Sequence, residues 1–252
     1  MSVDDHYTHP GSGGVLRNLL NLRDGAELDQ ALNEFATVRW AQLEREPLPE
    51  RFNLAQLQYL HRRLFEDVYP FAGDLRDVDV QALGAGIAYC RPAFLEEQAA
   101  FEFRRLENDG YLQERNAQDF AAGLADHWGE ITALHPFRDG NTRSQSAFVT
   151  QLAARAGWTL QWSAVDVDQL RALRLEAVTR SSAPLAGHLE ERIRPVAAAS
   201  AEELQQLRFL VSSPRAADAA TDAPTEARSA RDRMRSAGSS LDERRRDGLG
   251  RA

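Results

Sequence analysis

The chain has 252 residues, of which 43% are hydrophobic and 27% are charged, and its formal net charge is −8. This composition is sufficient for the core of one good-sized domain with an additional segment, or of two small domains. The single cysteine, Cys90, excludes a disulfide framework and a cysteine-based zinc site. All 30 basic residues are arginine, which excludes lysine-dependent chemistry such as a P-loop or a Schiff base.

Membrane and secretory signals are also missing from this sequence. No stretch reaches the roughly 18–20 consecutive apolar residues that a membrane span needs. Residues 1–6 are acidic and lack the apolar run of a secretory signal. We therefore expect a cytoplasmic protein that makes no contact with a membrane.

The composition changes near residue 196. Residues 1–196 have apolar side chains at helical spacing and are predicted to form one domain with an N-terminal arm, and an amphipathic patch in 197–211 predicts a short helical extension. Residues 212–252 contain nine Arg, seven Asp or Glu and few large apolar side chains, so we expect them to be disordered. The remaining residues, 1–211, have 21 Arg and 31 acidic residues, a charge of −10 that disfavours direct binding to nucleic acid.

Hydrophobic residues recur with a period near 3.6 through most of the predicted domain, which indicates helices. Pro47 and Pro49 close the first helix, and Asn53 is a suitable N-cap for the second. Pro92 suits the first turn of the third. The predicted helices span residues 27–43, 54–68, 92–106, 117–134, 141–156, 165–178 and 186–193.

Strand signals are confined to one region. Residues 75–80 alternate with a period of two, Gly84 and Gly86 mark a turn, and a short run follows at 87–90. This pattern predicts a small β-hairpin. The predicted fold class is therefore all-α with one hairpin.

The side chains best suited to catalysis or ligand binding are concentrated between two apolar helices, in the sequence His-Pro-Phe-Arg-Asp-Gly-Asn-Thr-Arg at 135–143. Asn141 opens a helix, and the unpaired N–H groups of a helix start attract anions. Arg143 adds a cation, Asp139 adds an oxygen ligand suited to Mg²⁺, and His135 can take a proton near neutral pH. Each residue alone is more often structural. Together they predict a phosphate and metal site beside a general base, which suits nucleotidyl or phosphoryl transfer.

This segment resembles the signature of the Fic (Fic/Doc, Fido-fold) family, His-Pro-Phe-x-Asp/Glu-Gly-Asn-x-Arg. Residues 64–78 resemble the family's segment ahead of its β-hairpin flap, and residues 7–18 resemble the opening of bacterial Fic toxins. The resemblance covers about residues 7–195. It implies the Fic helical fold with a small β-hairpin flap.

The resemblance implies transfer of AMP from ATP to a Ser, Thr or Tyr hydroxyl of a target protein, a toxin-like activity. His135 would take the proton of the acceptor hydroxyl, and Asp139 would hold Mg²⁺ on the phosphates. Pro136 and Phe137 would be structural, with Phe137 orienting the loop. The residues implied to bind the nucleotide phosphates are Gly140, Asn141, Thr142, Arg143 and, at the last position of the longer motif, Ser146.

Under the same resemblance, the hairpin is the flap that docks the target by strand addition, main chain to main chain. A bulky apolar side chain there, such as Ile87, is a candidate to pin the acceptor side chain. The implied flap residues are Ala82, Leu83, Gly84, Ala85, Gly86, Ile87, Ala88 and Tyr89.

Two positions depart from the family pattern. Thr142 stands where the family usually has Gly or Lys; it adds bulk at the phosphate turn, although its hydroxyl can donate to a phosphate oxygen. Ser146 replaces a second arginine that binds the terminal phosphate of ATP in the family. Loss of such a charged contact costs about 1.5–3 kcal/mol. Alternatives therefore stay open: transfer of another nucleotide or phosphoryl group, or a catalytically weakened nucleotide-binding or scaffold protein.

Many family members are silenced by a helix with the pattern Ser/Thr-x-x-x-Glu-Gly/Asn. The only Glu followed by Gly or Asn in these 252 residues is Glu107, and Phe103 stands four positions before it, so the pattern is absent. Any inhibition is therefore expected to come from a separate antitoxin-like chain.

Other titratable groups give weaker signals. His61, His127 and His188 lie on predicted helices, and we expect them to be structural or exposed. Cys90 is expected to be buried and inert.

Overall fold

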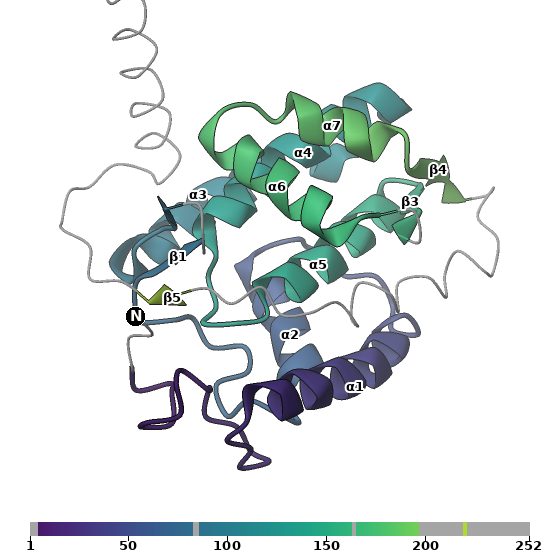
Figure 1. Ribbon diagram of the computed structural model, residues 1–252. Helices are drawn as coiled ribbons and strands as arrows, with labels where there is room; N and C mark the ends of the chain where they lie inside the picture. Colours follow the sequence, from purple (N-terminus) through teal and green to yellow (C-terminus); the bar gives the residue numbers. More distant parts are fainter. Residues whose placement is uncertain (1–4, 83–85, 163–164, 197–218, 221–252) are drawn as a thin grey trace, which may run out of the picture.

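Helices form most of the computed structural model, which describes residues 5–82, 86–162, 165–196 and 219–220 (Figure 1). The expectation of a predominantly helical fold is confirmed. Two short 3-10 turns, Pro92–Phe94 and Gly110–Leu112, precede and follow α3. The α-helices of the described residues are α1 (Gly25–Leu43), α2 (Leu54–Phe65), α3 (Leu95–Asn108), α4 (Ala117–Leu134), α5 (Asn141–Arg155), α6 (Val167–Thr179) and α7 (Ala183–Glu190).

Side-chain caps mark several helix starts. The Asn53 side chain accepts the backbone N–H of Gln56 at 3.0 Å, which confirms Asn53 as the N-cap of α2. Asp24, Asn116 and Asp166 cap α1, α4 and α6 in the same way. Each cap satisfies an N–H group that has no partner within its own helix, and such a cap contributes about 1 kcal/mol.

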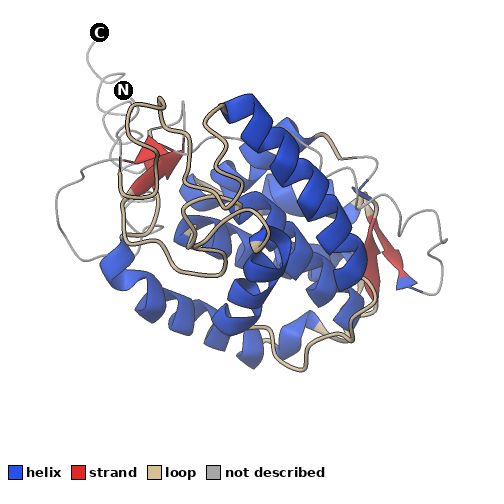
Figure 2. Cartoon of the chain, turned by 90° about the horizontal axis from the view of Figure 1, so that it is seen from below, coloured by secondary structure: helices blue, strands red, loops and turns tan. Residues whose placement is uncertain are grey.

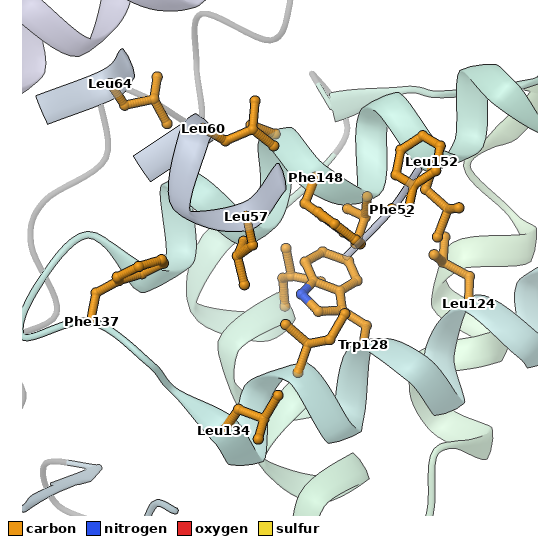
Figure 3. Packing of buried hydrophobic residues seen from close by; sticks show 14 of the residues in the cluster. Phe52, Leu57, Leu60, Leu64, Leu124, Trp128, Leu134, Phe137, Phe148 and Leu152 are labelled. Carbon is orange, nitrogen blue, oxygen red and sulfur yellow. The ribbon is translucent and has the colours of Figure 1, made fainter. Parts of the chain in front are cut away.

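The core lies between helices that are distant in the sequence. α4 contacts α3, α5, α6 and α7, whereas α2 contacts α1 and α5. Figure 3 shows buried side chains of α2, α4 and α5 around Trp128, with Leu57 and Phe148 close to it. Phe137, in the loop between α4 and α5, belongs to the same cluster. The loop that contains the predicted motif is therefore anchored in the core.

Two small sets of strands lie at opposite ends of the helical body (Figure 2). β1 (Val80–Ala82) and β2 (Ile87–Ala88) form the predicted antiparallel hairpin. The other edge of β1 pairs antiparallel with β5 (Ala219–Ala220), so the strand order is β2-β1-β5. At the far end, β3 (Trp158–Leu160) pairs antiparallel with β4 (Ile193–Pro195).

The predicted strand at 75–80 is wrong for most of its length, because β1 begins only at Val80. Arg76 is buried, and its guanidinium Nε donates to the carbonyl oxygen of His135 at 2.8 Å. The backbone N–H of Arg76 donates to the carbonyl oxygen of Pro136 at 2.9 Å. The predicted strand pattern therefore belongs to an irregular segment, in which Arg76 and Val80 are the buried side chains.

The β3–β4 pair was not predicted. Each strand has three residues and its partner is remote in the sequence, so no hairpin turn signals the pair. α2 ends at Phe65, before the predicted residue 68, and α7 begins at Ala183 with Pro184 in its first turn. α7 also ends at Glu190, so Ile193, the predicted last residue of this helix, instead begins β4. The other helix boundaries lie close to the predicted ones, and those of α4 coincide with them.

The predicted helical extension at 197–211 lies outside the described residues, as does the predicted disordered segment 212–252 apart from β5. Within that segment, the structure describes only Ala219–Ala220, which pair with β1. No helix in the described part of the chain is long and apolar enough to cross a membrane.

Candidate active site

The motif loop connects the end of α4 to the start of α5. His135 follows α4 in a left-handed conformation (φ 43°, ψ 60°), and its N–H still donates to the Ile131 carbonyl at 3.2 Å. Gly140, also left-handed (φ 79°), precedes the first residue of α5, Asn141. The loop between them is therefore short and closes on itself. It brings the imidazole-bearing end of one helix close to the positively polarised start of the next.

The Asn141 side chain holds this loop in shape. Its Nδ2 donates to the Phe137 carbonyl at 2.7 Å, and its Oδ1 accepts the Phe137 N–H at 3.0 Å. The Asn141 amide, expected to bind phosphate, thus makes both of these hydrogen bonds inside the loop. The N–H of Ser144 is the first to bond back, to Gly140 at 3.1 Å, so the N–H groups of 141–143 form the helix start that can bind an anion.

His61 of α2 contacts the motif loop through a hydrogen bond and a stacked ring. Its Nδ1 accepts the Gly73 N–H at 2.8 Å, so the proton is on Nε2, which donates to the Asp139 carbonyl at 2.8 Å. The ring stacks on Phe137 with centroids 3.9 Å apart. Burial lowers the pKa of His61 from 6.5 to about 4, so the ring stays neutral at pH 7. The structural role expected for His61 is confirmed: the ring holds the motif loop through Asp139 and Phe137.

The low pKa of His61 makes stability depend on pH. In the unfolded chain this histidine gains a proton as the pH falls below about 6.5, whereas in the folded chain it stays neutral down to about 4. The unfolded state binds more protons in this window, so the free energy of unfolding is expected to fall by about 3 kcal/mol between pH 7 and pH 4 on account of His61.

Chemical denaturation at several pH values checks this expectation. His61→Gln, which does not titrate, is expected to lose this part of the pH dependence, whereas the same substitution at the exposed His6 is expected to retain it. An unchanged pH dependence in His61→Gln would contradict the assignment.

The Asp139 carboxylate is oriented by Tyr69. The Tyr69 hydroxyl donates to Asp139 Oδ2 at 2.6 Å, and both residues are buried. Tyr69 in turn stacks on Phe71, with ring centroids 4.6 Å apart. The carboxylate therefore has a defined direction beside the start of α5, as a ligand of a cation on the phosphates requires.

His135 is held between the flap and the helical body. Its ring stacks on Tyr89, with centroids 3.8 Å apart and an interplanar angle of 7°. The N–H of Tyr89 donates to the Val80 carbonyl at 3.1 Å, which continues the β1–β2 pairing. Arg76 donates to the carbonyl oxygens of His135 and of Cys90. The base of the flap is thus attached directly to the predicted general base.

The two arginine positions of the longer motif differ in their surroundings. Arg143 is buried, its Nη2 donates to Asn33 Oδ1 at 2.6 Å, and its Cζ lies 5.8 Å from the centre of the Phe65 ring. Ser146 is fully buried, and its hydroxyl has no hydrogen-bond partner among the described residues. The Thr142 hydroxyl oxygen accepts a long hydrogen bond from Nη1 of Arg174 in α6, at 3.4 Å.

Similarity to known proteins agrees with this site. Residues 51–153 match the family model described as the Fic/DOC family. A probable protein adenylyltransferase Fic from Escherichia coli K12 is 36% identical over 162 residues, which are 64% of this chain and 78% of that protein. This chain belongs to the Fic/DOC family. The probable protein adenylyltransferase y4lH of Sinorhizobium fredii is 33% identical over 195 residues, covering 76% of this chain and 97% of that protein.

Solved structures confirm the Fic fold. The BepC protein of Bartonella tribocorum, crystallised with bound AMPPNP, superposes with a TM-score of 0.71 at 23% identity, and the match covers 75% of this chain and 96% of that chain. A Fic domain from Bartonella quintana, crystallised with bound ADP, has a TM-score of 0.72, also at 23% identity. The similarity expected from the motif therefore extends to the whole helical arrangement.

Several residues of this Fic site were not singled out from the sequence. Asn33, Tyr69, Arg76 and Arg174 contact motif residues from other elements of the fold. Tyr69 and Arg76 fall within 64–78, which resembles the family, so a local signal existed for them. Of the implied flap, Ala82 and Gly86 to Tyr89 are described, whereas 83–85 lie outside the described residues.

Proposed function

We propose that this Fic domain transfers AMP from ATP to a hydroxyl group of a target protein. The observation that supports it most directly is the single short loop between α4 and α5. It brings His135, a side chain that can accept a proton, close to a helix start that can bind phosphates. The relatives that are 36% and 33% identical are named as probable protein adenylyltransferases, which supports the same reaction.

In this reaction His135 takes the proton of the acceptor Ser, Thr or Tyr hydroxyl. The oxygen then forms a bond to the α-phosphorus of ATP, and the bond to the β-phosphate oxygen breaks with its electron pair. The products are the AMP-modified protein and pyrophosphate. The N–H groups of 141–143 and the guanidinium of Arg143 stabilise the charge on the phosphate oxygens.

Mg²⁺ fits this site as a companion of ATP. No group of three or more His, Cys, Asp or Glu side chains in the described chain forms a protein cage for a metal. Mg²⁺ does not need one, because it keeps several waters and is held by one or two carboxylates and the substrate phosphates. Asp139, oriented by Tyr69, would hold it, and the ion would neutralise negative charge on the phosphates.

In this proposal, the target protein docks on the β1–β2 hairpin. An extended segment of the target pairs with it main chain to main chain, and the half-buried Ile87 is the residue proposed to pin the acceptor residue. The order β2-β1-β5 means that an added strand either uses the outer edge of β2 or replaces β5 on β1. The proposal includes toxin-like action in the cytoplasm and restraint by a separate antitoxin-like chain.

The position of the radiolabel tests the reaction. The full chain is incubated with Mg²⁺ and ATP labelled on either the α- or the γ-phosphate, with lysate proteins as acceptors. We expect protein to be labelled from α-labelled ATP, and the γ-label to leave in pyrophosphate. Labelling from the γ-phosphate alone would indicate phosphoryl transfer and would overturn the proposal, as would the absence of labelled protein with both donors.

A further inference from the structure

An N-terminal arm, residues 5–18, precedes the residues that match the family model, 51–153. Its backbone is held by its own hydrogen bonds. The N–H of Thr8 donates to the Asp5 carbonyl at 3.0 Å, and the N–H of Arg17 donates to the Tyr7 carbonyl at 2.7 Å. Thr8 also forms a β-bridge with Leu16, which is fully buried. The arm is therefore a fixed part of the fold.

Asp5 connects this arm to the motif loop. Its Oδ1 accepts the N–H of Tyr7 at 2.9 Å, which fixes the direction of the carboxylate. Its Oδ2 accepts a hydrogen bond from Nε of Arg138 at 2.9 Å, across 133 positions of the sequence. The Arg138 side chain is 6% exposed and that of Asp5 is 9% exposed. An ion pair this well shielded from solvent is screened much less by salt than a surface pair is.

Arg138 lies at the centre of the loop, between positions that are held from other directions. The carbonyl oxygen of Pro136 accepts the Arg76 N–H, and the carbonyl oxygen of Asp139 accepts Nε2–H of His61. The family signature specifies no residue at position 138. The contact with Asp5 thus adds a third anchor to the loop, through a residue that the motif leaves open.

A row of aromatic rings makes a second connection between the arm and the loop. Tyr7 packs edge-on against Phe71, with ring centroids 5.0 Å apart. Phe71 stacks on Tyr69, whose hydroxyl donates to the Asp139 carboxylate. The arm therefore contacts both the centre of the loop and the rings that orient the carboxylate of Asp139.

We propose that Asp5 is a positioning residue for AMP transfer, which it supports by holding the motif loop in place through Arg138. This inference rests on the proposed function. Neither side chain is assigned a contact with the nucleotide or the acceptor, so loss of the pair changes the placement of the reacting groups. The maximal rate is then expected to fall, while the affinity for ATP stays nearly constant.

Initial rates of protein labelling from α-labelled ATP test this role in the full chain, at a fixed concentration of lysate proteins. Asp5→Asn is expected to lower the maximal rate about tenfold, less than the roughly 100-fold that a 1 Å displacement can cost. The ATP concentration that gives half of this rate is expected to change less than about threefold. Arg138→Gln is expected to have the same effect. The double variant is expected to be no slower than the slower single variant, because both substitutions remove the same ion pair.

Two further variants separate positioning from a loss of stability. Arg138→Lys keeps the positive charge and is expected to be faster than Arg138→Gln. Arg39→Gln breaks a comparable ion pair, between Arg39 and Asp67 at 2.6 Å, whose side chains are 21% and 29% exposed. This matched control is expected to keep the wild-type maximal rate. Denaturant unfolding of each variant shows that the rates compare folded proteins.

Several outcomes would overturn the role of Asp5 while AMP transfer by the wild-type protein still stands. These are an unchanged maximal rate in Asp5→Asn, a double variant whose loss is the product of the two single losses, and an equal loss in Arg39→Gln. A higher half-saturating ATP concentration at an unchanged maximal rate would also overturn it, because the pair would then act on nucleotide binding. A wild-type chain that labels no protein would instead overturn the proposed AMP transfer, and with it the role of Asp5.

Discussion

Replacement of His135 by alanine is expected to lower the rate of AMP transfer by about 10²–10⁴-fold, the range that a positioned general base contributes. His135 follows the end of α4, in the loop that leads to α5, and Tyr89 stacks on its ring. No phosphate contact is assigned to the imidazole. We therefore expect ATP to bind the variant about as well as the wild type.

Initial rates with α-labelled ATP, together with titration calorimetry for ATP, check this expectation. His6→Ala removes an exposed histidine, whose side chain is 59% accessible, and serves as the matched control with unchanged rates. Equal labelling by wild type and His135→Ala would contradict the role of His135. A parallel loss of ATP binding would assign His135 to the nucleotide site instead.

Replacement of Gly140 by alanine is expected to lower the rate of AMP transfer by about 100-fold, because it changes the shape of the loop. Gly140 has φ +79°, which a residue with a Cβ adopts at a cost of about 1–2 kcal/mol. The added Cβ would lie 2.4 Å from Phe65 Cε2 and 3.1 Å from His61 Nε2. Both neighbours are fully buried, and overpacking of this kind costs about 1–3 kcal/mol more. The start of α5 must then shift, and a displacement of about 1 Å can lower the rate about 100-fold.

Gly157 provides a control for the backbone part of this effect. It follows α5 with φ +87°, and a Cβ there would meet no atom within 4 Å. Gly157→Ala is expected to lower the free energy of unfolding by about 1–2 kcal/mol and to leave the rate unchanged. Denaturant unfolding and AMP-transfer assays of both variants separate the two effects. A Gly140→Ala protein with wild-type activity would show that the loop tolerates a Cβ.

The site depends on contacts from outside the motif. The backbone carbonyl oxygens of His135, Pro136 and Asp139 accept hydrogen bonds from Arg76 and His61, at 2.8–2.9 Å. These donors come from separate elements and direct the loop from different sides. The loop is thereby held in place before any nucleotide arrives, and such preorganisation is what electrostatic stabilisation of a transition state requires.

Much of this architecture could be predicted from local patterns. The boundaries of α4 coincide with the prediction, and Asn53 caps α2 as expected, because periodicity and capping act within one or two turns of a helix. The nine residues 135–143 indicated the family and predicted the chemistry, since residue types that suit a base, a metal ligand and a phosphate site follow one another along a single loop. These features depend on neighbours in the chain.

The remaining features depend on neighbours in space. The alternation of 75–80 predicted a strand, but this segment is irregular up to Val80, because the buried Arg76 side chain bonds to the motif loop. The β3–β4 pair joins two short segments that are remote in the sequence. His61 could be expected to be structural, but only the packing of α2 against α5 brings its Nε2 within hydrogen-bond distance of the Asp139 carbonyl. Likewise, the motif leaves position 138 open, whereas the pairing of Arg138 with Asp5 exists only because the N-terminal arm folds against the motif loop. Hydrogen bonds between distant segments form only where folding brings donor and acceptor within about 3 Å, a condition that no local pattern expresses.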